Sequence, residues 1–349
     1  MSDHNQFTRR GLLKTAGGLA LVSGISAPAI LRAQTADVIR IGHLTPRTGF
    51  LGPLGEYAVM AIDLAVEEIN ASGGMMGRKV ELLKEDSVNP QTASTKAERM
   101  IERDRVACIV GEISSASCLT IAQVAERNKI LFINTGGNFA GDDLVPTDAT
   151  DFSAYLLKIR DAKPDLVVIN LAGNQITNFL KQYAEFGLTF PVGGFGFDTA
   201  LAWAAGKGNF VGTWPVVWHH LLETPGSKAF VAAFTKKYSK PPENQAWGDY
   251  IAIKIVAQTI NELKSAESPK IIEHFEKGAK FDLLKTRPGY FRASDHQLMH
   301  EMYAVTALPA DKIKNQWDIF SSSPAVPGPD EELEVIAATK EENSCAFPT

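Results

Sequence analysis

The chain has 349 residues, of which 45% are hydrophobic and 21% are charged. This composition is typical of a soluble globular protein, and the length is sufficient for two hydrophobic cores rather than one. The formal net charge is −5, and no segment after the first residues supplies the basic patch that nucleic acid or an anionic membrane requires. The composition therefore argues against both partners and favours a small one.

Residues 1–33 have the pattern of an export signal. Arg9 and Arg10 precede an apolar stretch over residues 17–30, and Ala33 is a small residue suited to cleavage. The apolar stretch is too short to span a bilayer, and a paired arginine before it is typical of the twin-arginine route. We therefore expect the twin-arginine translocase to export the chain to the periplasm. The alternative is the basic start of an ordinary core helix.

From Val38 onward, short runs of β-branched residues alternate with helical patterns. Pro90 stands just before one helical pattern and the serines of residues 114–117 before another, which is typical of helix starts. Strands are expected at residues 38–44, 79–86, 106–111 and 130–134, and helices at residues 54–70, 92–103 and 115–128. Four strands that alternate with three helices predict a parallel sheet with right-handed crossovers.

A second series of the same kind follows after residue 142. Strands are expected at residues 143–146, 164–171, 190–197 and 209–220, and helices at 151–162 and 175–186. Two further helices, at 247–263 and 269–278, precede an extended pattern over 287–308. The last residues are rich in Pro, Ser and Glu and predict a surface tail with at most a short helix.

The three cysteines are too few for a disulfide framework. Cys108 lies in an expected strand and Cys118 in the helix after it, so both are expected to be buried as small hydrophobic residues. Cys345, in the polar C-terminal segment, is expected to be exposed.

Three loops follow strands of the first series, where open parallel sheets bind their ligands. They are "TPRTGFLGPLG", "GEISSAS" and "NTGGN", all rich in Gly, Ser and Thr. Ser114 and Ser115 also add hydroxyl groups at a helix N-terminus, where free amides and the helix dipole favour a carboxylate. The alternative is that these serines only cap their own helix.

No motif for a cofactor or a reaction accompanies these loops. Neither G-x-G-x-x-G, a P-loop, G-x-S-x-G nor H-E-x-x-H occurs. His219 and His220 are adjacent in an expected strand and face opposite ways, and the segment of His296 and His300 lacks a suitably placed carboxylate. We therefore expect no cofactor, no metal site and no enzymatic activity.

Five segments carry a resemblance to a known family: "IRIGHLTPRTGFLGPLG", "AVEEINASGGMMGRKVELLKED", "IVGEISSAS", "TDFSAYLLKIRDAKPDLVVINLAG" and "GYFRASDHQLMH". Over nearly the whole mature chain, the sequence resembles the type I periplasmic binding proteins of the branched-chain amino acid (Leu/Ile/Val) group of ABC importers. The resemblance implies an α/β fold of two doubly wound parallel-sheet lobes, joined by three crossings, that close on a small ligand. It places lobe 1 at residues 37–137 and 244–298, lobe 2 at 138–243 and 299–330, and a C-terminal tail at 331–349.

The resemblance also implies a ligand site between the lobes. Carried over by position, its residues are Ser114, Ser115, Gly136 and Asn138 from lobe 1, and Gly173, Asn174, Phe197 and Asp198 from lobe 2. Asp198 would meet an ammonium group of the ligand, or else cap the helix that follows it. The aromatic residues Phe50, Phe195 and Trp218 would form an apolar wall, or else belong to the core.

The chain departs from the family pattern between Asn138 and Asp142. There the family has a helix, a strand and another helix before the strand expected at 143–146, whereas only three residues are present here. We expect this internal deletion to leave lobe 2 without its first helix-strand-helix unit and lobe 1 as the better-ordered half. We also expect the 142–146 strand to lie at an exposed sheet edge, and ligand binding to be weakened.

The resulting hypothesis is an exported receptor of an ABC importer. It would capture a branched-chain amino acid or related small carboxylate and deliver it to the permease, which a partner ATPase drives. The alternatives are a binding-impaired or vestigial member of the family and a twin-arginine-exported oxidoreductase.

The export signal can be tested by replacing both Arg9 and Arg10 with lysine. Because the twin-arginine route requires the arginine pair, the precursor should remain in the cytoplasm, as measured by cell fractionation. Recovery of the variant from the periplasm at the level of the unchanged protein would contradict the assignment.

Overall fold

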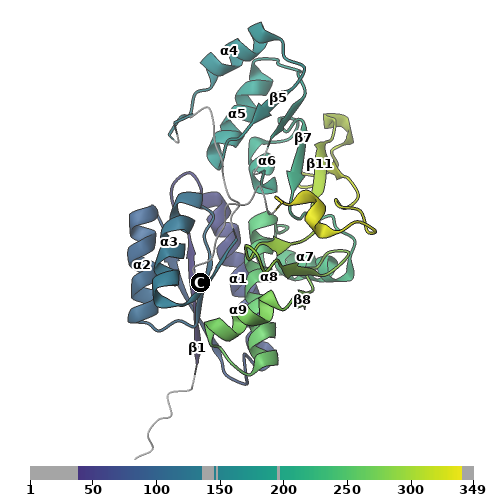
Figure 1. Ribbon diagram of the computed structural model, residues 1–349. Coiled ribbons are helices and arrows are strands. Elements are labelled where there is room, and N and C mark those ends of the chain that lie inside the picture. The colour runs from purple at the N-terminus through teal and green to yellow at the C-terminus, as the bar shows by residue number, and fades with distance from the viewer. Residues whose placement is uncertain (1–37, 136–144, 147, 195–196, 340–349) are drawn as a thin grey trace, which may run out of the picture. The chain divides into compact units, whose positions relative to one another are not determined.

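The structure is a computed structural model that describes residues 38–135, 145–146, 148–194 and 197–339. The fold described below is that of the unit Asp37–Thr349. It contains a four-stranded sheet, a five-stranded sheet and a small three-stranded sheet (Figure 1). Among the described residues, no helix is both long and apolar enough to cross a membrane.

The first sheet has the strand order β2-β1-β3-β4, and all of its strands run parallel, as predicted. Its strands are β1 (Ile39–Thr45), β2 (Val80–Asp86), β3 (Cys108–Gly111) and β4 (Leu131–Asn134), and its connecting helices are α1 (Gly52–Ala71), α2 (Pro90–Glu102) and α3 (Ser115–Asn128). The helix starts follow from local chemistry. Asn89 accepts a hydrogen bond from the Thr92 amide at the start of α2, and Pro90 follows it in the first turn.

The second sheet has the order β12-β11-β7-β6-β5. Its strands are β5 (Val167–Ile169), β6 (Val192–Gly194), β7 (Thr213–Val216), β11 (Tyr303–Ala307) and β12 (Phe320–Ser322), with helices α4 (Ser153–Ala162), α5 (Asn174–Glu185) and α6 (Thr199–Ala205). Strands β5, β6 and β7 are parallel, and β11 runs antiparallel to β7 and β12. The strand expected over residues 209–220 is therefore much shorter, because only four of its residues pair.

Strand β5 forms one edge of the second sheet. The side chains of Leu166 and Val168 are 54% and 60% exposed there, and Tyr155 and Leu157 of α4 are also exposed. The strand expected at this edge, 142–146, falls mostly outside the described residues, and Val145 and Pro146 lie in no strand. The exposed edge that the structure describes is therefore that of β5.

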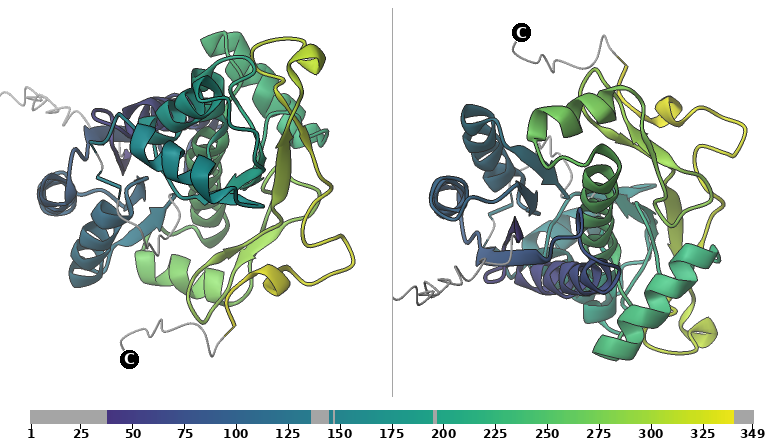
Figure 2. Two further views of the ribbon diagram at one scale, coloured as in Figure 1. Left: turned by 90° about the horizontal axis from the view of Figure 1, so that it is seen from above. Right: turned by 90° about the horizontal axis from the view of Figure 1, so that it is seen from below.

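Helix α7 (Pro225–Tyr238) was not expected from the sequence, and it packs near α1. Helices α8 (Asn244–Leu263) and α9 (Ser268–Glu276) follow, as predicted. Figure 2 shows α8 lying along α1, where the Tyr250 hydroxyl donates to Glu68 over 2.6 Å. The remaining elements are β8 (Lys280–Phe281), β9 (Gly289–Phe291), β10 (Leu298–Met299) and two short 3-10 helices, Ala310–Lys312 and Leu333–Ile336.

The chain enters or leaves the second sheet at three connections. The first follows β4, the second runs from β7 to α7, and the third runs from β10 to β11. Helices α8 and α9 contact β3 and β4, so the second connection leads back to the first sheet. These passages agree in number with the crossings implied by the family resemblance.

Candidate functional site

The carboxyl ends of β1, β3 and β4 meet at one edge of the first sheet, because the three strands are parallel and in register. The loop after β1 leads into α1, and the loop after β3 leads into α3. The Cys118 thiol of α3 donates to the Asn134 side chain at the end of β4, with 2.9 Å between Sγ and Oδ1. The strand ends after which the three loops follow are thus neighbours in space.

Glu112, in the loop after β3, is a buried residue that the sequence analysis did not select. Its backbone is left-handed, with φ of 72°, and its carboxylate Oε1 accepts hydrogen bonds from the amides of Ile113 (3.1 Å) and Ser114 (2.8 Å). Burial raises the pKa of Glu112, while the two amides lower it. Two amides of the expected carboxylate clamp are therefore occupied by the protein itself.

Ser114 caps its own helix, as the alternative interpretation held. It is the N-cap of α3, and its Oγ accepts from the Ser117 amide over 3.5 Å. Ser115 is the first residue of α3 and is half-buried, so its role toward a ligand stays a prediction. Gly136 and Asn138 lie outside the described residues.

A buried pair joins the centre of the first sheet to α8. His43 Nε2 of β1 lies 2.6 Å from Asp249 Oδ2, and both side chains are fully buried. Gly111 makes room for the imidazole, because a Cβ there would lie 2.9 Å from His43 Cδ2 and 2.4 Å from the Leu44 carbonyl oxygen. The Asp249 charge also contributes to the raised pKa of Glu112. The N-terminal part of α8 thus belongs to the same polar region.

Gly173 and Asn174 lie against the loop after β1. The Asn174 amide donates to the Phe50 carbonyl oxygen over 3.2 Å. Gly173 has φ of 52°, and a Cβ there would lie only 2.2 Å from the same oxygen, which explains why glycine is required. Two of the residues expected from lobe 2 therefore contact the first-sheet side directly.

Phe197 and Asp198 lie against the start of α8. The Phe197 carbonyl accepts from the Asn244 side chain over 2.9 Å, and Asp198 Oδ1 accepts from Gln245 Nε2 over 3.2 Å. Asp198 occupies the N-cap position of α6 but makes no capping hydrogen bond, so the capping alternative is wrong. The Phe197 ring is buried and stacks on Trp214 with a 4.8 Å centroid separation, so its side chain belongs to the core.

Asp198 faces a second buried carboxyl group, that of Glu243. Glu243 is the N-cap of α8, where its Oε1 accepts from the Ala246 amide over 2.9 Å. Burial raises the pKa of Asp198 from 3.8 to about 7. Burial, and then the Asp198 charge, also raises the pKa of Glu243 well above its usual value. Two neighbouring desolvated carboxyl groups repel each other when both are ionised. Without a cation nearby, one of them therefore keeps its proton.

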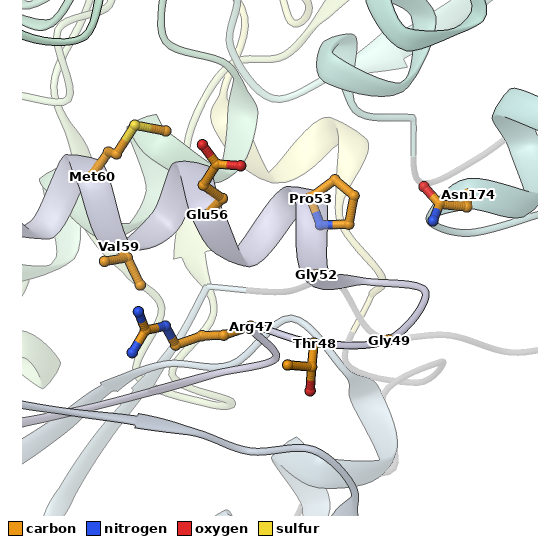
Figure 3. A pocket seen from close by; sticks show the side chains of 9 residues that line it. All are labelled: Arg47, Thr48, Gly49, Gly52, Pro53, Glu56, Val59, Met60 and Asn174. Carbon is orange, nitrogen blue, oxygen red and sulfur yellow. The ribbon is translucent and has the colours of Figure 1, made fainter.

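A hollow of about 590 Å³ lies beside the loop after β1 (Figure 3). It is lined by Arg47, Thr48, Gly49, Gly52, Pro53, Glu56, Val59, Met60 and Asn174. Figure 3 shows Arg47 and Thr48 on the loop, the side chains of Pro53, Glu56, Val59 and Met60 along α1, and Asn174 on the opposite side. Asn174 is the one expected ligand residue that lines it, and Arg47 and Glu56 are its charged side chains.

The expected apolar wall is not formed as a unit. Trp218 is fully buried and donates from its indole to Ser227 Oγ over 2.9 Å, so it belongs to the core. Phe50 is 36% exposed, and Phe195 lies outside the described residues.

The fold buries the side chains of Cys108, Cys118 and His219, and that of His220 is hydrogen-bonded. Cys108 and Cys118 are buried, as predicted, and burial raises the pKa of the Cys108 thiol to about 12. His219 lies 2.7 Å from Ser322 Oγ, and His220 lies 3.1 Å from Asp318 Oδ1. Within the described ranges, no group of three or more His, Cys, Asp or Glu side chains is placed to hold a metal ion. Cys345 falls outside those ranges.

The family model of periplasmic binding proteins matches this chain over residues 38–138 and 134–312. The chain belongs to the periplasmic binding protein family. Among curated family relatives, the Leu/Ile/Val-binding protein homolog 7 of Brucella suis biovar 1 is 24% identical over 362 aligned positions, covering 78% of this chain and 87% of the relative. Homolog 8 of Brucella abortus (strain 2308) is 25% identical and covers 75% and 84% of the two chains.

Solved structures show the same fold. A periplasmic binding protein from Burkholderia mallei has a TM-score of 0.79 at 21% identity, covering 89% of this chain and 99% of its own. The substrate-binding protein LivJ from Streptococcus pneumoniae, in complex with isoleucine, has a TM-score of 0.72 at 19% identity, covering 80% and 98%. A solute-binding protein from R. palustris, in complex with benzoate, has a TM-score of 0.70 at 18% identity, covering 83% and 97%. This α/β architecture is thus the one predicted.

The carboxyl pair predicts a pH-dependent stability difference between the unchanged protein and the variant Asp198→Asn. The folded state keeps a proton on Asp198 that the unfolded state releases above pH 3.8, so this group loses stability as pH rises from about 4 to about 7. The variant lacks that loss. The unfolding free energy of the variant minus that of the unchanged protein should therefore increase as pH rises, with a slope of up to about 1.4 kcal/mol per pH unit.

Denaturant unfolding at several pH values measures this difference. The comparison must be between variants, because burial lowers the pKa of His219 and His300 to about 3 and these groups lose stability as pH falls below 6.5. Asp161→Asn, at a side chain that is 79% exposed, is the matched control and should show a flat difference. A flat difference for Asp198→Asn as well would show that Asp198 is charged in the folded protein.

Proposed function

We propose that the protein is the periplasmic solute receptor of an ABC importer. It captures a branched-chain amino acid or a related small carboxylate between two lobes and delivers it to the permease and ATPase. The observation that carries this proposal is the meeting of loops from the two sheets: Asn174 against Phe50, and Asp198 against Gln245. A solute held there would contact both sheets, so its binding energy would favour the closed arrangement.

The chemistry at this place supports a ligand with two opposite charges. The N-terminus of α3, which begins at Ser115, carries the positive end of a helix dipole, which favours a carboxylate. The buried carboxyl groups of Asp198 and Glu243, near the start of α8, favour a cation. LivJ and the R. palustris protein were solved with isoleucine and with benzoate. An α-amino acid matches both halves of this chain's site, whereas benzoate matches only the first.

Export and partners belong to the same proposal. Residues 1–33 carry the paired Arg9 and Arg10 and would direct the chain through the twin-arginine translocase to the periplasm. The receptor would act by binding and closure, without catalysis and without nucleic acid. Lobe boundaries at 137/138, 243/244 and 298/299 are part of the proposal.

An impaired or vestigial receptor is the second candidate, and the deletion favours it. The two segments of the family match meet at residues 134–138, and the alignment to homolog 7 is longer than the part of this chain that it covers. That relative therefore has residues without a counterpart here. The exposed Leu166 and Val168 at the edge strand β5 are the surface that a missing strand would leave uncovered.

A thermal-shift screen separates the two candidates. The purified mature chain is heated with leucine, isoleucine, valine, benzoate and 3,4-dihydroxybenzoate, each in large excess. A ligand at 100 times its Kd adds about 2.7 kcal/mol to the unfolding free energy, so the receptor hypothesis predicts a clear rise in Tm with an amino acid. No rise with any of these compounds would favour the impaired candidate.

The two serines at the start of α3 should respond differently to alanine. Ser114→Ala removes the N-cap and should lower the unfolding free energy by about 1 kcal/mol with little change in affinity. Ser115→Ala should weaken binding of the ligand found in the screen by about 1 to 3 kcal/mol, the scale for a hydrogen bond to a charged group. Calorimetric titration and denaturant unfolding measure both effects. Unchanged affinity in Ser115→Ala would remove that residue from the site.

A further inference from the structure

Lys285 is a buried lysine at the centre of the connections between the sheets. It lies between β8 and β9 and is 6% exposed. Its Nζ lies 2.5 Å from the Val217 carbonyl oxygen, 2.6 Å from the Glu301 carbonyl oxygen and 2.9 Å from His300 Nδ1. One side-chain nitrogen therefore touches the chain just after β7 and again just before β11.

The surroundings of Lys285 satisfy its hydrogen bonds in either protonation state. As an ammonium group it donates to both carbonyls and to a neutral His300, and as an amine it donates to the carbonyls and accepts from His300. Burial lowers the pKa of Lys285, and the Glu301 carboxylate opposes that effect. The Trp247 ring of α8, whose centroid lies 4.4 Å from Nζ, covers the group. The contact is thus a built one rather than a chance approach of a flexible side chain.

The neighbouring residue holds the other end of the second connection. The Leu284 carbonyl accepts from Thr224 Oγ1 (2.6 Å) and from Ser227 Oγ (2.8 Å) at the start of α7. Lys285 holds Val217 at the beginning of the same connection. Residues 284 and 285 therefore hydrogen-bond to both ends of the second connection, just after β7 and at the start of α7.

The third connection is held through Glu301 as well. Its carboxylate, which is buried, accepts from the Thr286 amide over 2.8 Å, from Thr286 Oγ1 and from the Tyr303 hydroxyl over 2.6 Å. The segment 284–286 thus binds both the second and the third connection through consecutive residues.

We propose that Lys285 is a positioning residue that holds the second and third connections against each other and against α8, so that they move as one unit when the lobes close. This inference rests on the proposed function, because only a protein that closes on a solute needs a defined hinge. Among the described residues, the hydrogen bonds of Lys285 reach none that belongs to the proposed ligand site. It acts through the connections by limiting the arrangements that the second sheet can adopt.

The variant Lys285→Met tests this positioning role, because methionine fills a similar volume but has no hydrogen-bond donor. Hydrogen exchange of the ligand-free protein should become at least tenfold faster in residues 217–222 and 300–303 together, with exchange in β1 and α3 unchanged. Thr286→Val keeps Lys285 but removes the hydroxyl that binds Glu301, so faster exchange should be confined to 300–303. Lys270→Met, at an exposed lysine of α9, is the matched control and should change neither segment.

The outcomes separate the positioning role of Lys285 from a merely structural one. Faster exchange confined to residues 282–288, or equal acceleration throughout the chain, would overturn the proposal. If Lys285→Met does not fold, Lys285→Gln, which keeps a donor, is judged by the same two segments. Titration with isoleucine and benzoate is a separate test. If neither binds the unchanged protein, the proposed function fails, while the exchange result still decides whether Lys285 is a positioning residue. If one binds, Lys285→Met should weaken it at least tenfold.

Discussion

Parallel hydrogen bonding among the strands of the first sheet determines where the rest of the molecule places its polar groups. Because β1, β3 and β4 run the same way and in register, their carboxyl ends form one edge. Helices α1 and α3 begin at that edge, so their N-termini face the same region. The loops of the second sheet at Asn174 and Asp198 then meet this edge and the start of α8. Neither a motif nor a cofactor is needed to assemble such a site.

Buried charge is concentrated where the chain passes between the sheets. Glu112 and Asp249 lie beneath the first-sheet edge, the Asp198 and Glu243 pair lies at the start of α8, and Lys285 lies between the second and third connections. A buried charge is costly unless it is paired or hydrogen-bonded. Each of these groups therefore requires a particular arrangement of its neighbours, which apolar packing alone would not impose. The polar groups at the connections accordingly restrict how their neighbours can be arranged, while the apolar residues supply most of the stability.

The sequence was sufficient for most helices and strands and insufficient for contacts between distant segments. The bounds of α3 agree with those expected because Ser114 caps it and the apolar period is clear. The role of Asp198 toward a ligand stays a prediction. Helix α7 was not expected, although Thr224 and Pro225 form a typical helix start. Glu112 was missed because its carboxylate binds amides of its own loop, and no local pattern distinguishes that from a solvated glutamate. The contacts of Lys285 join residues far apart in sequence, which a single chain's pattern cannot reveal.

Capture between two lobes requires one solute to contact both sheets at once. Hydrogen exchange with and without saturating isoleucine measures this directly. We expect slower exchange in two places: the start of α3, at residues 113–117, and the starts of α5 and α6, at 174–177 and 198–201. Slower exchange on one sheet alone, with binding established by calorimetry, would contradict capture between two lobes.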